Sequence, residues 1–486
     1  MTDSRLAIVV LAAGQGTRMK SATPKVLHEL AGIPLIGHVL STAQALAAAH
    51  LLVVVRHERD RVAATAKALA PEARIVDQDE MPGTGRAVEQ AVDALPADFD
   101  GDVLVLSADV PLMDADTLAS VLAGHRAANV PVTLFSTVVA DPTGYGRVVR
   151  EADGSVSRIV EQKDASEAER AIAEVNAGMY VFAAAALRDK LAGLTTGNAQ
   201  GEKYLTDVVG ALHGDGHTIG GVVVAEEWKV WGVNDRAQLA QVGAQLNALT
   251  VRGWQLAGVT IQDPATTWID RAVTIEPDVT ILPGTQLKGA TAIAAGAVIG
   301  PDTTLVDTEV GAGATVKRTD ATLAVIAAGA TVGPFSYLRP GTELGADGKI
   351  GAFVETKNAH IGEGAKVPHL SYIGDASVGD GANIGAGGIT ANYDGVNKHR
   401  TEIGAHVKTG AHTVMVAPVT IGAGAYTGAG TTIRNDVPAG ALALGIAPQR
   451  NREGWVHTHR PGSAADQAAL DARSSADAQD EERQAR

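Results

Sequence analysis

The stretch IEPDVTILPGTQLKGATAIAAGAVIGPDTTL, residues 275–305, decides the fold of the second half of the chain. An aliphatic residue opens each block of six, at Ile275, Ile281, Leu287, Ile293, Ile299 and Leu305. A period of six fits neither the helical turn of about 3.6 residues nor the two-residue alternation of a strand. It is typical of a parallel β-helix, in which each short strand turns a corner after every sixth residue.

The same period returns later in the chain, at Ile361, Val367, Ile373, Ile403, Met415, Ile421 and Ile433, with Thr409 and Thr427 in phase. A flexible linker rich in Gly and Ala is the alternative, but it would not keep an aliphatic phase for so long. Two stretches, Gly345–Ala359 and Ile389–Glu402, break the rhythm. Breaks in a solenoid are usually loops on one face, and often the functional ones.

Composition supports two different kinds of domain. The 486 residues contain 55 glycines, 24 of them before residue 259 and 31 after it, and only 3% are aromatic. Glycine permits the unusual backbone angles of prism corners, and a narrow bore filled by Ile, Val and Leu has no room for Trp. A hydrophobic content of 45% excludes a wholly disordered chain.

The chain has no cysteine, which excludes disulfides, thiolate metal sites, Fe–S clusters and a thiol nucleophile. A net charge of −15 argues against a nucleic-acid binder but leaves anionic small substrates open. The apolar run at residues 6–13 lacks a following cleavage pattern, so we read it as a buried strand instead of a signal peptide. We predict a cytoplasmic protein without a membrane partner.

The first part of the chain alternates expected strands and helices, at Leu6–Ala12, Leu35–Leu46, Leu51–Val55, Arg61–Leu69, Arg74–Val76, Arg86–Leu95 and Asp102–Leu106. This alternation predicts an α/β domain with a parallel, doubly wound sheet, whose ligands gather at the carboxyl ends of the strands. We expect this domain at residues 1–236, a helical linker at 237–258, the β-helix at 259–457 and a disordered tail at 458–486.

A glycine loop, LAAGQGTRM (Leu11–Met19), follows the first expected strand directly, and PKVLH begins at Pro24. Glycines let backbone N–H groups approach phosphates closely, and Arg18 and Lys25 can neutralise their charge. The loop contains neither GxGxxG nor GxxxxGK[ST], which disfavours a dinucleotide-binding turn and a P-loop.

This loop with its following P-K is similar to that of sugar-1-phosphate nucleotidyltransferases. It resembles most the uridylyltransferase half of the bacterial bifunctional UDP-N-acetylglucosamine pyrophosphorylases/glucosamine-1-phosphate acetyltransferases. Further family motifs follow in order, at Gln78 with Gly83 and Thr84 (QDEMPGTG), Asp109 (SADVP), Gly146 (TGYGR), Glu161 (IVEQKDA), Asn176 (VNAGMY) and Asn234 (WGVND). Ser107 and Ala108 depart from the family, which often has Tyr or another residue before the Asp motif.

In the expected uridylyl transfer, a sugar-1-phosphate oxygen attacks the α-phosphorus of UTP and expels pyrophosphate. The nucleophile is already anionic, so the barrier comes mainly from repulsion between crowded negative charges and from alignment of the reactants. A Mg²⁺ ion bound by hard oxygen ligands reduces this repulsion. The resemblance implies Asp109 and Asn234 as metal ligands and Lys25 and Arg18 as catalytic cations. It also implies that Lys25 and Asn234 contact UDP-N-acetylglucosamine together with a larger set of residues: Leu11, Ala12, Ala13, Gly14, Gln78, Gly83, Thr84, Gly146, Glu161 and Asn176. Within this set Gln78 and Thr84 are expected to read uracil, and Gly146, Glu161 and Asn176 to hold the sugar.

A polar set lies near the breaks of the six-residue rhythm, where a coil of Gly, Ala and Ile does not need it: Arg339, Lys357, His369, Tyr372, Asn383, Asn392 and Tyr393. Their motifs (YLRPG, VETKNAHIG, VPHLSYIG, ANIGAG, NYDG) match the acetyltransferase half of the same family. Moving an acetyl group from a thioester to an amine requires the amine to lose a proton, and histidine titrates near neutrality. His369 is therefore the expected general base.

The resemblance implies that Arg339 and Lys357 bind the phosphate of glucosamine-1-phosphate and that Tyr372 and Asn383 orient its sugar. Asn392 is expected to donate hydrogen bonds near the reacting carbonyl. Acetyl-CoA is expected to contact Ala386, Asn392, Tyr393, Ala411, Ala429 and Ile446. The family commonly has Ser at the position of Ala411 and Arg at that of Ile446, so Lys408, Arg450 and Arg452 become candidates for binding the CoA phosphates.

The resemblance further implies homotrimers that form through the β-helix, with acetyl-CoA sites between subunits. Two alternatives remain open from the residues alone. One is a monofunctional nucleotidyltransferase with a purely structural β-helix, which His369 and Asn392 oppose. The other is a non-catalytic scaffold that binds sugar nucleotides, which Lys25, Asp109 and Asn234 oppose.

Overall fold

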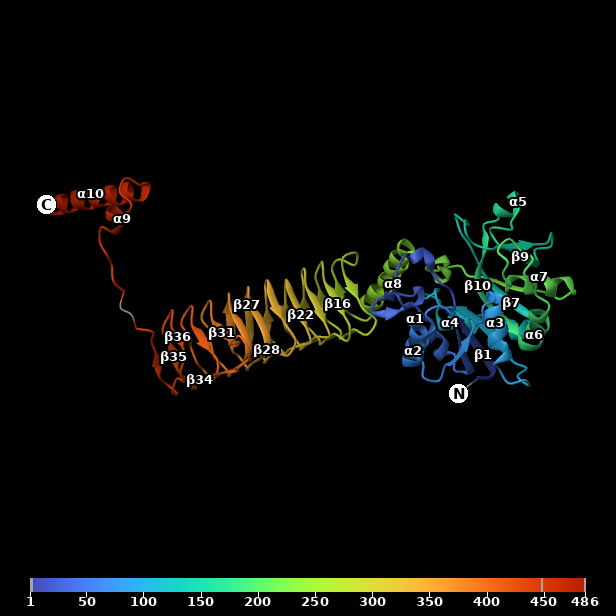
Figure 1. Ribbon diagram of the computed structural model, residues 1–486, viewed down its shortest axis with the longest axis horizontal. Coiled ribbons are helices and arrows are strands. Elements are labelled where there is room, and N and C mark those ends of the chain that lie inside the picture. The colour runs from blue at the N-terminus through green and yellow to red at the C-terminus, as the bar shows by residue number, and fades with distance from the viewer. Residues whose placement is uncertain (1–2, 447–448, 485–486) are drawn as a thin grey trace.

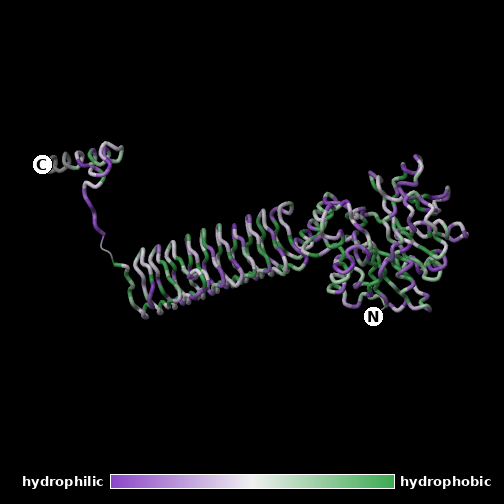
Figure 2. The backbone as a smooth tube through the Cα atoms, viewed as in Figure 1, coloured by the Kyte–Doolittle hydropathy of each residue, from purple (hydrophilic) through white to green (hydrophobic). Residues whose placement is uncertain are grey.

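The computed structural model describes residues 3–446 and 449–484. A globular α/β domain and a long rod of short strands follow one another along the chain, and helix α8 (Arg236–Leu256) lies where they meet (Figure 1). Green and purple stretches alternate along the coils of the rod, whereas green gathers inside the globular domain (Figure 2).

The globular domain is built on a sheet with the strand order β11-β7-β10-β6-β1-β4-β5. The bounds of these strands are β1 Asp3–Leu11, β4 Ala48–Val55, β5 Arg74–Asp77, β6 Asp102–Ser107, β7 Val132–Val138, β10 Glu174–Ala183 and β11 Gly220–Val223. Its larger helices are α1 Leu35–Ala45, α2 Arg59–Leu69, α3 Thr84–Asp93, α4 Ala115–Ala128, α6 Ala184–Ala192 and α7 Thr206–Gly214.

The central strand β1 is buried on both faces. Ile8 and Val10 pack into one apolar core, while Ala7 and Val9 pack into the core on the other side of the sheet. A strand covered by helices on both faces needs a continuous apolar run, which explains why β1 shows no alternation in sequence.

One strand departs from the parallel arrangement. β1 pairs in parallel with β4 and β6, but β10 lies antiparallel between β6 and β7. Parallel neighbours need a crossover, usually a helix that covers the sheet. The segment before β10 instead holds the hairpin of β8 (Arg147–Arg150) and β9 (Val156–Val160) and the four-residue helix α5 (Glu167–Arg170), so the chain returns in the opposite direction.

The rod is a parallel β-helix. One face is the sheet β12-β15-β18-β21-β24-β27-β29, and a second sheet, from β13 (Trp268–Ile269) to β36 (Thr432–Ile433), wraps the rest. The first sheet has the bounds β12 Thr260–Ile261, β15 Thr280–Ile281, β18 Val298–Ile299, β21 Thr315–Val316, β24 Thr331–Val332, β27 Lys349–Ala352 and β29 Lys366–His369.

The register of both sheets follows the six-residue period. Ile281 pairs with Ile299 and Leu287 with Leu305, so one coil spans three of the repeats quoted above. All four side chains have an exposed fraction of 0%, which confirms that the aliphatic phase fills the bore.

The prediction of a loop at residues 345–359 is wrong. Strands β27 and β28 (Glu355–Ile361) continue the coils through this stretch. Thr356 takes the inward position in place of an aliphatic residue, fully buried, and its hydroxyl lies 3.0 Å from that of Thr342. A buried hydroxyl with a hydrogen-bond partner is tolerated in a core, so the coil continues although the hydropathy phase lapses.

The second break is a true excursion. Strand β31 (Ile389–Ala391) and strand β32 (Thr401–Ile403) belong to the coil, and residues 392–400 between them leave it. We call this segment loop 392–400. Asn392, at its start, is 8% exposed and stays against the rod, whereas Tyr393 is 60% exposed. Such an excursion is expected of a functional insertion in a solenoid.

The tail also differs from expectation. Helices α9 (Trp455–His459) and α10 (Ala464–Gln484) replace the disorder expected after residue 457. Ala, Glu, Gln and Arg favour helix even without a core to pack against. No helix among the described residues is both long and apolar enough to cross a membrane.

Candidate active sites

The glycine loop leaves the carboxyl end of β1 and packs against Lys25. Gly16 has a φ of 65°, and a Cβ built there would lie 2.5 Å from the Cβ of Lys25. Only glycine satisfies both the left-handed conformation and this close approach. The loop sequence therefore fixes where Lys25 stands.

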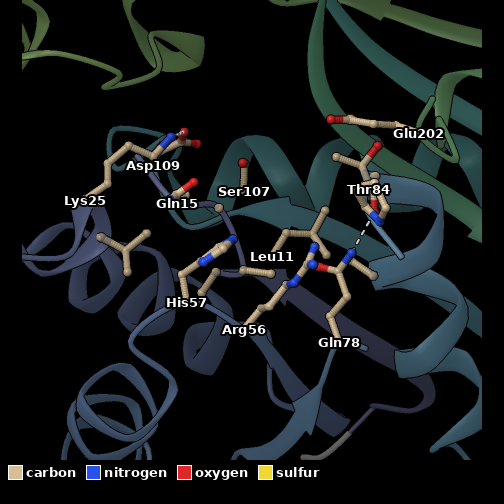
Figure 3. Close-up of a pocket in the computed structure, with 17 residues that line it drawn as sticks. Leu11, Gln15, Lys25, Arg56, His57, Gln78, Thr84, Ser107, Asp109 and Glu202 are labelled. Atoms are coloured by element: carbon tan, nitrogen blue, oxygen red, sulfur yellow. Dashed lines mark hydrogen bonds and ion pairs between the residues drawn. The ribbon is translucent and has the colours of Figure 1, made fainter. Parts of the chain in front are cut away.

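A cavity of about 480 Å³ opens beside this loop (Figure 3), within the size range of small-ligand sites. Nine residues predicted from the motifs line it: Leu11, Ala12, Ala13, Gly14, Lys25, Gln78, Gly83, Thr84 and Asp109. Lys25 comes from a short 3₁₀ turn, Lys25–Leu27, and the others come from the carboxyl ends of β1, β5 and β6 and the start of α3. This edge is where an α/β sheet gathers its ligands.

Asp109 and Lys25 line one end of the cavity, and Asn234, the other predicted metal ligand, contacts Lys25. The ammonium of Lys25 forms an ion pair with Asp109 Oδ2 and lies 3.3 Å from Asn234 Oδ1, so two oxygens from distant parts of the chain converge on one cation. In the described parts of the chain no group of three or more His, Cys, Asp or Glu could hold a metal. A carboxylate and an amide oxygen suit Mg²⁺, which takes its other ligands from substrate phosphates and water.

The other end of the cavity is organised by Gln78, which is 9% exposed. Its Nε2 donates to the carbonyl oxygens of Met81, at 2.9 Å, and Gly83, at 3.1 Å. Gly83 has a φ of 115°, and a Cβ there would clash with the backbone of Lys203. Both amide hydrogens of Gln78 are thus used by the protein, and Oε1 is the atom left to bind a ligand.

Gly146, Glu161 and Asn176 form a separate group near this cavity. The backbone N–H of Asn176 donates to the carbonyl of Gly146 at 2.9 Å, and a Cβ on Gly146 would lie 3.5 Å from Glu161 Oε1. Burial raises the pKa of the Glu161 carboxyl. Burial is the main cause that raises the pKa of the Tyr145 hydroxyl, beside Gly146, and the charges of Glu227 and Asp109 raise this pKa further.

Arg18 is not brought to the cavity. It lies exposed on a short 3₁₀ turn, Thr17–Met19. Eight further residues line the cavity, and four of them are polar or charged residues that the motifs did not single out: Gln15, Arg56, His57 and Glu202. Arg56 and His57 follow the carboxyl end of β4, so the rule that ligands gather at strand ends would have found them.

On the β-helix, part of the predicted polar set forms one connected group. Strand β28 lies beside β30 (Tyr372–Val378), where Glu355 pairs with Tyr372. Arg339 Nη1 donates to Glu355 Oε1 at 2.9 Å. Lys357 lies on the same strand as Glu355 and faces the next coil.

Asp375, which the motifs did not single out, is at the centre of this group. Its carboxylate accepts from Asn358 Nδ2 at 2.9 Å and from Asn392 Nδ2 at 2.5 Å, and Lys357 Nζ lies 3.8 Å away. Burial opposes its ionisation, but the two amide hydrogen bonds and the charges of Lys357 and Lys398 outweigh burial and hold the pKa of Asp375 below its ordinary value. Lys398, from loop 392–400, was not singled out by the motifs either. It is a second cation beside the predicted Lys357.

His369 lies at one corner of the prism, and the small residues Ala386, Ala411 and Ala429 follow it in a column along this corner on the next coils. The backbone oxygens of His369, Ala386 and Ala411 each accept a hydrogen bond from the next coil, at 3.2, 2.7 and 2.8 Å. Ala429 continues the column, because a Cβ on Gly410 would meet its backbone. His369, Ala411 and Ala429 are exposed, so the corner presents a shallow surface one residue wide per coil.

The remaining predicted residues are spread out. Asn383 pairs with Lys366 and Lys408 on the face of β29. Tyr393 is 60% exposed, and its hydroxyl donates to the carbonyl of Gly395 at 2.6 Å. Ile446 is 82% exposed near the end of the rod. Among the side-chain hydrogen bonds of residues 3–446 and 449–484, none joins these three, or His369, to the Asp375 group.

A glycine loop suited to phosphate binding lies at the edge of the α/β sheet, and the β-helix that follows has a polar site of its own. Together they define a two-domain transferase with a nucleotidyltransferase half. A family model, the MobA-like NTP transferase domain, matches residues 8–212. The bifunctional protein GlmU of Leifsonia xyli subsp. xyli is 69% identical, over 96% of this chain and 96% of that protein. Those of Clavibacter sepedonicus and Mycolicibacterium gilvum are 60% and 58% identical, each over 96% of this chain and 95% of the relative.

The chain belongs to the family of bifunctional GlmU proteins. It is a bifunctional enzyme of UDP-N-acetylglucosamine synthesis, both an N-acetylglucosamine-1-phosphate uridylyltransferase and a glucosamine-1-phosphate N-acetyltransferase. This excludes the scaffold and the monofunctional enzyme that the residues alone left open.

Proposed function

We propose that the cavity beside the glycine loop carries out uridylyl transfer and that the β-helix group around His369 and Asp375 carries out acetyl transfer, which comes first. The observation that carries this division is that each domain holds its own cluster of charged side chains. Lys25, Asp109 and Asn234 meet in one domain, and Lys357, Asp375 and Asn392 meet in the other.

In the first domain, Asp109 and Asn234 would hold Mg²⁺. The fit is supported by their two oxygens, which already converge on the positive charge of Lys25. When bound, Mg²⁺ neutralises charge on crowded phosphate oxygens. Lys25, once released from Asp109, is close enough to the glycine loop to pair with the phosphates of UTP.

The uridylyl step then needs alignment more than acid–base chemistry. A P–O bond forms between the phosphate of N-acetylglucosamine-1-phosphate and the α-phosphorus of UTP, and the bond to pyrophosphate breaks. Backbone N–H groups of residues 11–14 hold the nucleotide, Gln78 and Thr84 read uracil, and Gly146, Glu161 and Asn176 hold the sugar. Arg18 has a phosphate role only if its exposed turn moves toward the cavity.

In the second domain, Arg339 and Lys357 bind the phosphate of glucosamine-1-phosphate, and we add Lys398 to them. Tyr372 and Asn383 orient the sugar. His369 takes a proton from the amine as the C–N bond forms and the C–S bond of acetyl-CoA breaks, and the CoA thiolate takes up a proton as it leaves.

Acetyl-CoA is proposed to lie along the corner that His369, Ala386, Ala411 and Ala429 form. The small side chains of Ala386, Ala411 and Ala429 on three successive coils leave room for an extended cofactor next to His369. Because Ala411 offers no hydroxyl and Ile446 no charge, the CoA phosphates must find cations elsewhere. Lys408 on the rod, and Arg450 and Arg452 beyond it, are the proposed partners.

A homotrimer is supported by an exposed apolar ladder on three successive coils. Phe335, Phe353 and Leu370 are 53%, 59% and 63% exposed, and the two Phe rings stack with centroids 5.3 Å apart. A contiguous exposed apolar patch marks an interaction surface more often than a free one. Leu370 follows His369 directly, so subunits that meet at this ladder would place acetyl-CoA sites between them. A cytoplasmic location, where UTP and acetyl-CoA are available, completes the proposal.

The His369→Ala variant tests the proposal. It should lose release of the CoA thiol from acetyl-CoA and glucosamine-1-phosphate by at least about 100-fold, the scale of general-base catalysis. It should keep release of pyrophosphate from UTP and N-acetylglucosamine-1-phosphate, which checks that the chain is folded. Thiol release at the wild-type rate would exclude His369 as the base.

A further inference from the structure

The side-chain amide nitrogen of Asn392 does not point where the expected role, donating a hydrogen bond near the reacting carbonyl, would need it. Its Nδ2 donates to Asp375 Oδ2 at 2.5 Å and lies 3.5 Å from the hydroxyl of Tyr372. An ionised carboxylate only accepts hydrogen bonds, so Asp375 dictates that the –NH₂ end of Asn392 faces it. The lowered pKa of Asp375 means that this carboxylate is ionised at neutral pH.

The carbonyl end of the Asn392 side chain is therefore the end left for a ligand. Within residues 3–446 and 449–484, Oδ1 of Asn392 accepts no hydrogen bond, and it is not among the buried polar atoms that lack a partner. An amide oxygen is an acceptor. It suits an amine, which offers N–H groups, better than the oxygen of a thioester carbonyl, which offers none.

We propose that Asn392 accepts a hydrogen bond from the amino group of glucosamine-1-phosphate through Oδ1, and that Asp375 is the positioning residue that fixes this orientation. The inference rests on the proposed acetyl-transfer site. One N–H of the amine is bound by Asn392 and another proton passes to His369, which leaves the nitrogen lone pair directed at the thioester carbon.

The surroundings of Asp375 make it a rigid support. The residue is 9% exposed and has a φ of 49°, a left-handed corner conformation that Asp adopts more readily than most non-glycine residues. Asn358, the corner residue of the preceding coil, donates to its other oxygen at 2.9 Å, and Lys357 balances its charge at 3.8 Å. Every oxygen of the carboxylate thus has a partner in the group.

An exchange of the two side chains tests the direction of the hydrogen bond. In the double variant Asp375→Asn with Asn392→Asp, the amide placed at position 375 can still accept from Asn358 and can donate to the carboxylate placed at position 392. The other oxygen of that carboxylate then faces the substrate as an acceptor. The exchange keeps the acceptor at position 392 and removes every donor from it.

Each single variant should lower kcat for acetyl transfer by about 10-fold or more, the effect of losing one orienting hydrogen bond. Asn392→Asp alone sets two carboxylates against each other, and Asp375→Asn alone no longer dictates the amide orientation. The double variant should recover activity to within a few-fold of wild type. If it is as slow as the slower single variant, Asn392 acts as a donor and the inference is overturned.

Two controls separate this outcome from misfolding and from failure of the site itself. Asp347→Asn alters another left-handed corner aspartate of the rod, with a φ of 55°, and should leave acetyl transfer unchanged. Uridylyl transfer by every variant reports that the chain is folded. If His369→Ala keeps acetyl transfer, the proposed function fails. If it loses acetyl transfer while the exchanged pair stays inactive, only the role of Asp375 and Asn392 fails.

Discussion

Gln78 and Asn392 use the same physical device in two different domains. In each, protein oxygens hold the –NH₂ end of a carboxamide: the carbonyls of Met81 and Gly83 for Gln78, and the carboxylate of Asp375 for Asn392. The oxygen end is left for the ligand. A carboxamide without such partners offers both a donor and an acceptor and discriminates poorly between ligands.

For Gln78 this orientation predicts nucleotide selectivity. Its Oε1 can accept from N3–H of uracil, whereas N3 of cytosine carries no hydrogen and would face the oxygen with a lone pair. Gln78→Met should lower kcat/KM for UTP by about 10- to 100-fold, because an unpaired N3–H is left in a buried site. Activity with CTP should change little, so the ratio of the two kcat/KM values should collapse.

The matched control is Gln44→Met, a change on an exposed glutamine whose Nε2 donates to Glu72 at 2.9 Å. It should leave both nucleotides unaffected. Undiminished preference for UTP in Gln78→Met would show that another group reads the base.

Residue types were easier to predict from sequence than residue orientations. Lys25, Asp109 and Asn234 were chosen from motifs, and they meet in space. The orientation of the Asn392 side-chain amide could not be predicted from the sequence. It depends on Asp375, which belongs to none of the motifs that pointed to catalytic or binding residues. Arg18 was expected near phosphate because it lies in the loop motif, yet a local 3₁₀ turn directs it to solvent.

At the scale of elements, hydrophobic period predicted the β-helix but not all of its coils. The six-residue period was recognised only by its Ile, Leu and Val residues, so the coil around Thr356 was mistaken for a loop. A threonine can take the inward position there because its buried hydroxyl has a hydrogen-bond partner. The same reasoning gave a parallel sheet for the first domain, because the antiparallel direction of β10 depends on a hairpin and not on its own residues.

The ladder of Phe335, Phe353 and Leu370 allows a prediction about assembly. Phe353→Asp replaces one of the two stacked rings with a charge, whose burial by a partner subunit would be costly. The molar mass measured by light scattering should fall from that of a trimer to that of smaller species. Acetyl transfer should fall with it, since we propose that the acetyl-CoA site lies between subunits, while uridylyl transfer should persist.

Val223→Asp provides the control, because Val223 is exposed to a similar degree, 47%, on a strand of the first domain. It should leave the molar mass unchanged. A Phe353→Asp variant that stays trimeric would place the subunit contact elsewhere on the rod.

At the scale of the whole molecule, the two domains meet at a junction formed by α8 and the first coil of the rod, and each domain has its own candidate site. Asn247 of α8 donates to the carbonyl of Thr267 at 2.7 Å and accepts from the N–H of Ile269 at 3.1 Å. Arg271 of the first coil donates to the Ser41 hydroxyl of the globular domain at 3.0 Å. Rod and globular domain extend in different directions from there (Figure 1).

Such an arrangement lets the two reactions be removed one at a time, which is the central claim. The direct measurement supplies glucosamine-1-phosphate, acetyl-CoA and UTP to Asp109→Ala, to His369→Ala, and to an equimolar mixture of the two, and follows thiol and pyrophosphate separately. We expect Asp109→Ala to release thiol only, His369→Ala to release neither, and the mixture to release both, because acetylated product from one variant feeds the other. Loss of both products with Asp109→Ala, or a mixture that releases no pyrophosphate, would contradict two independent sites acting in this order.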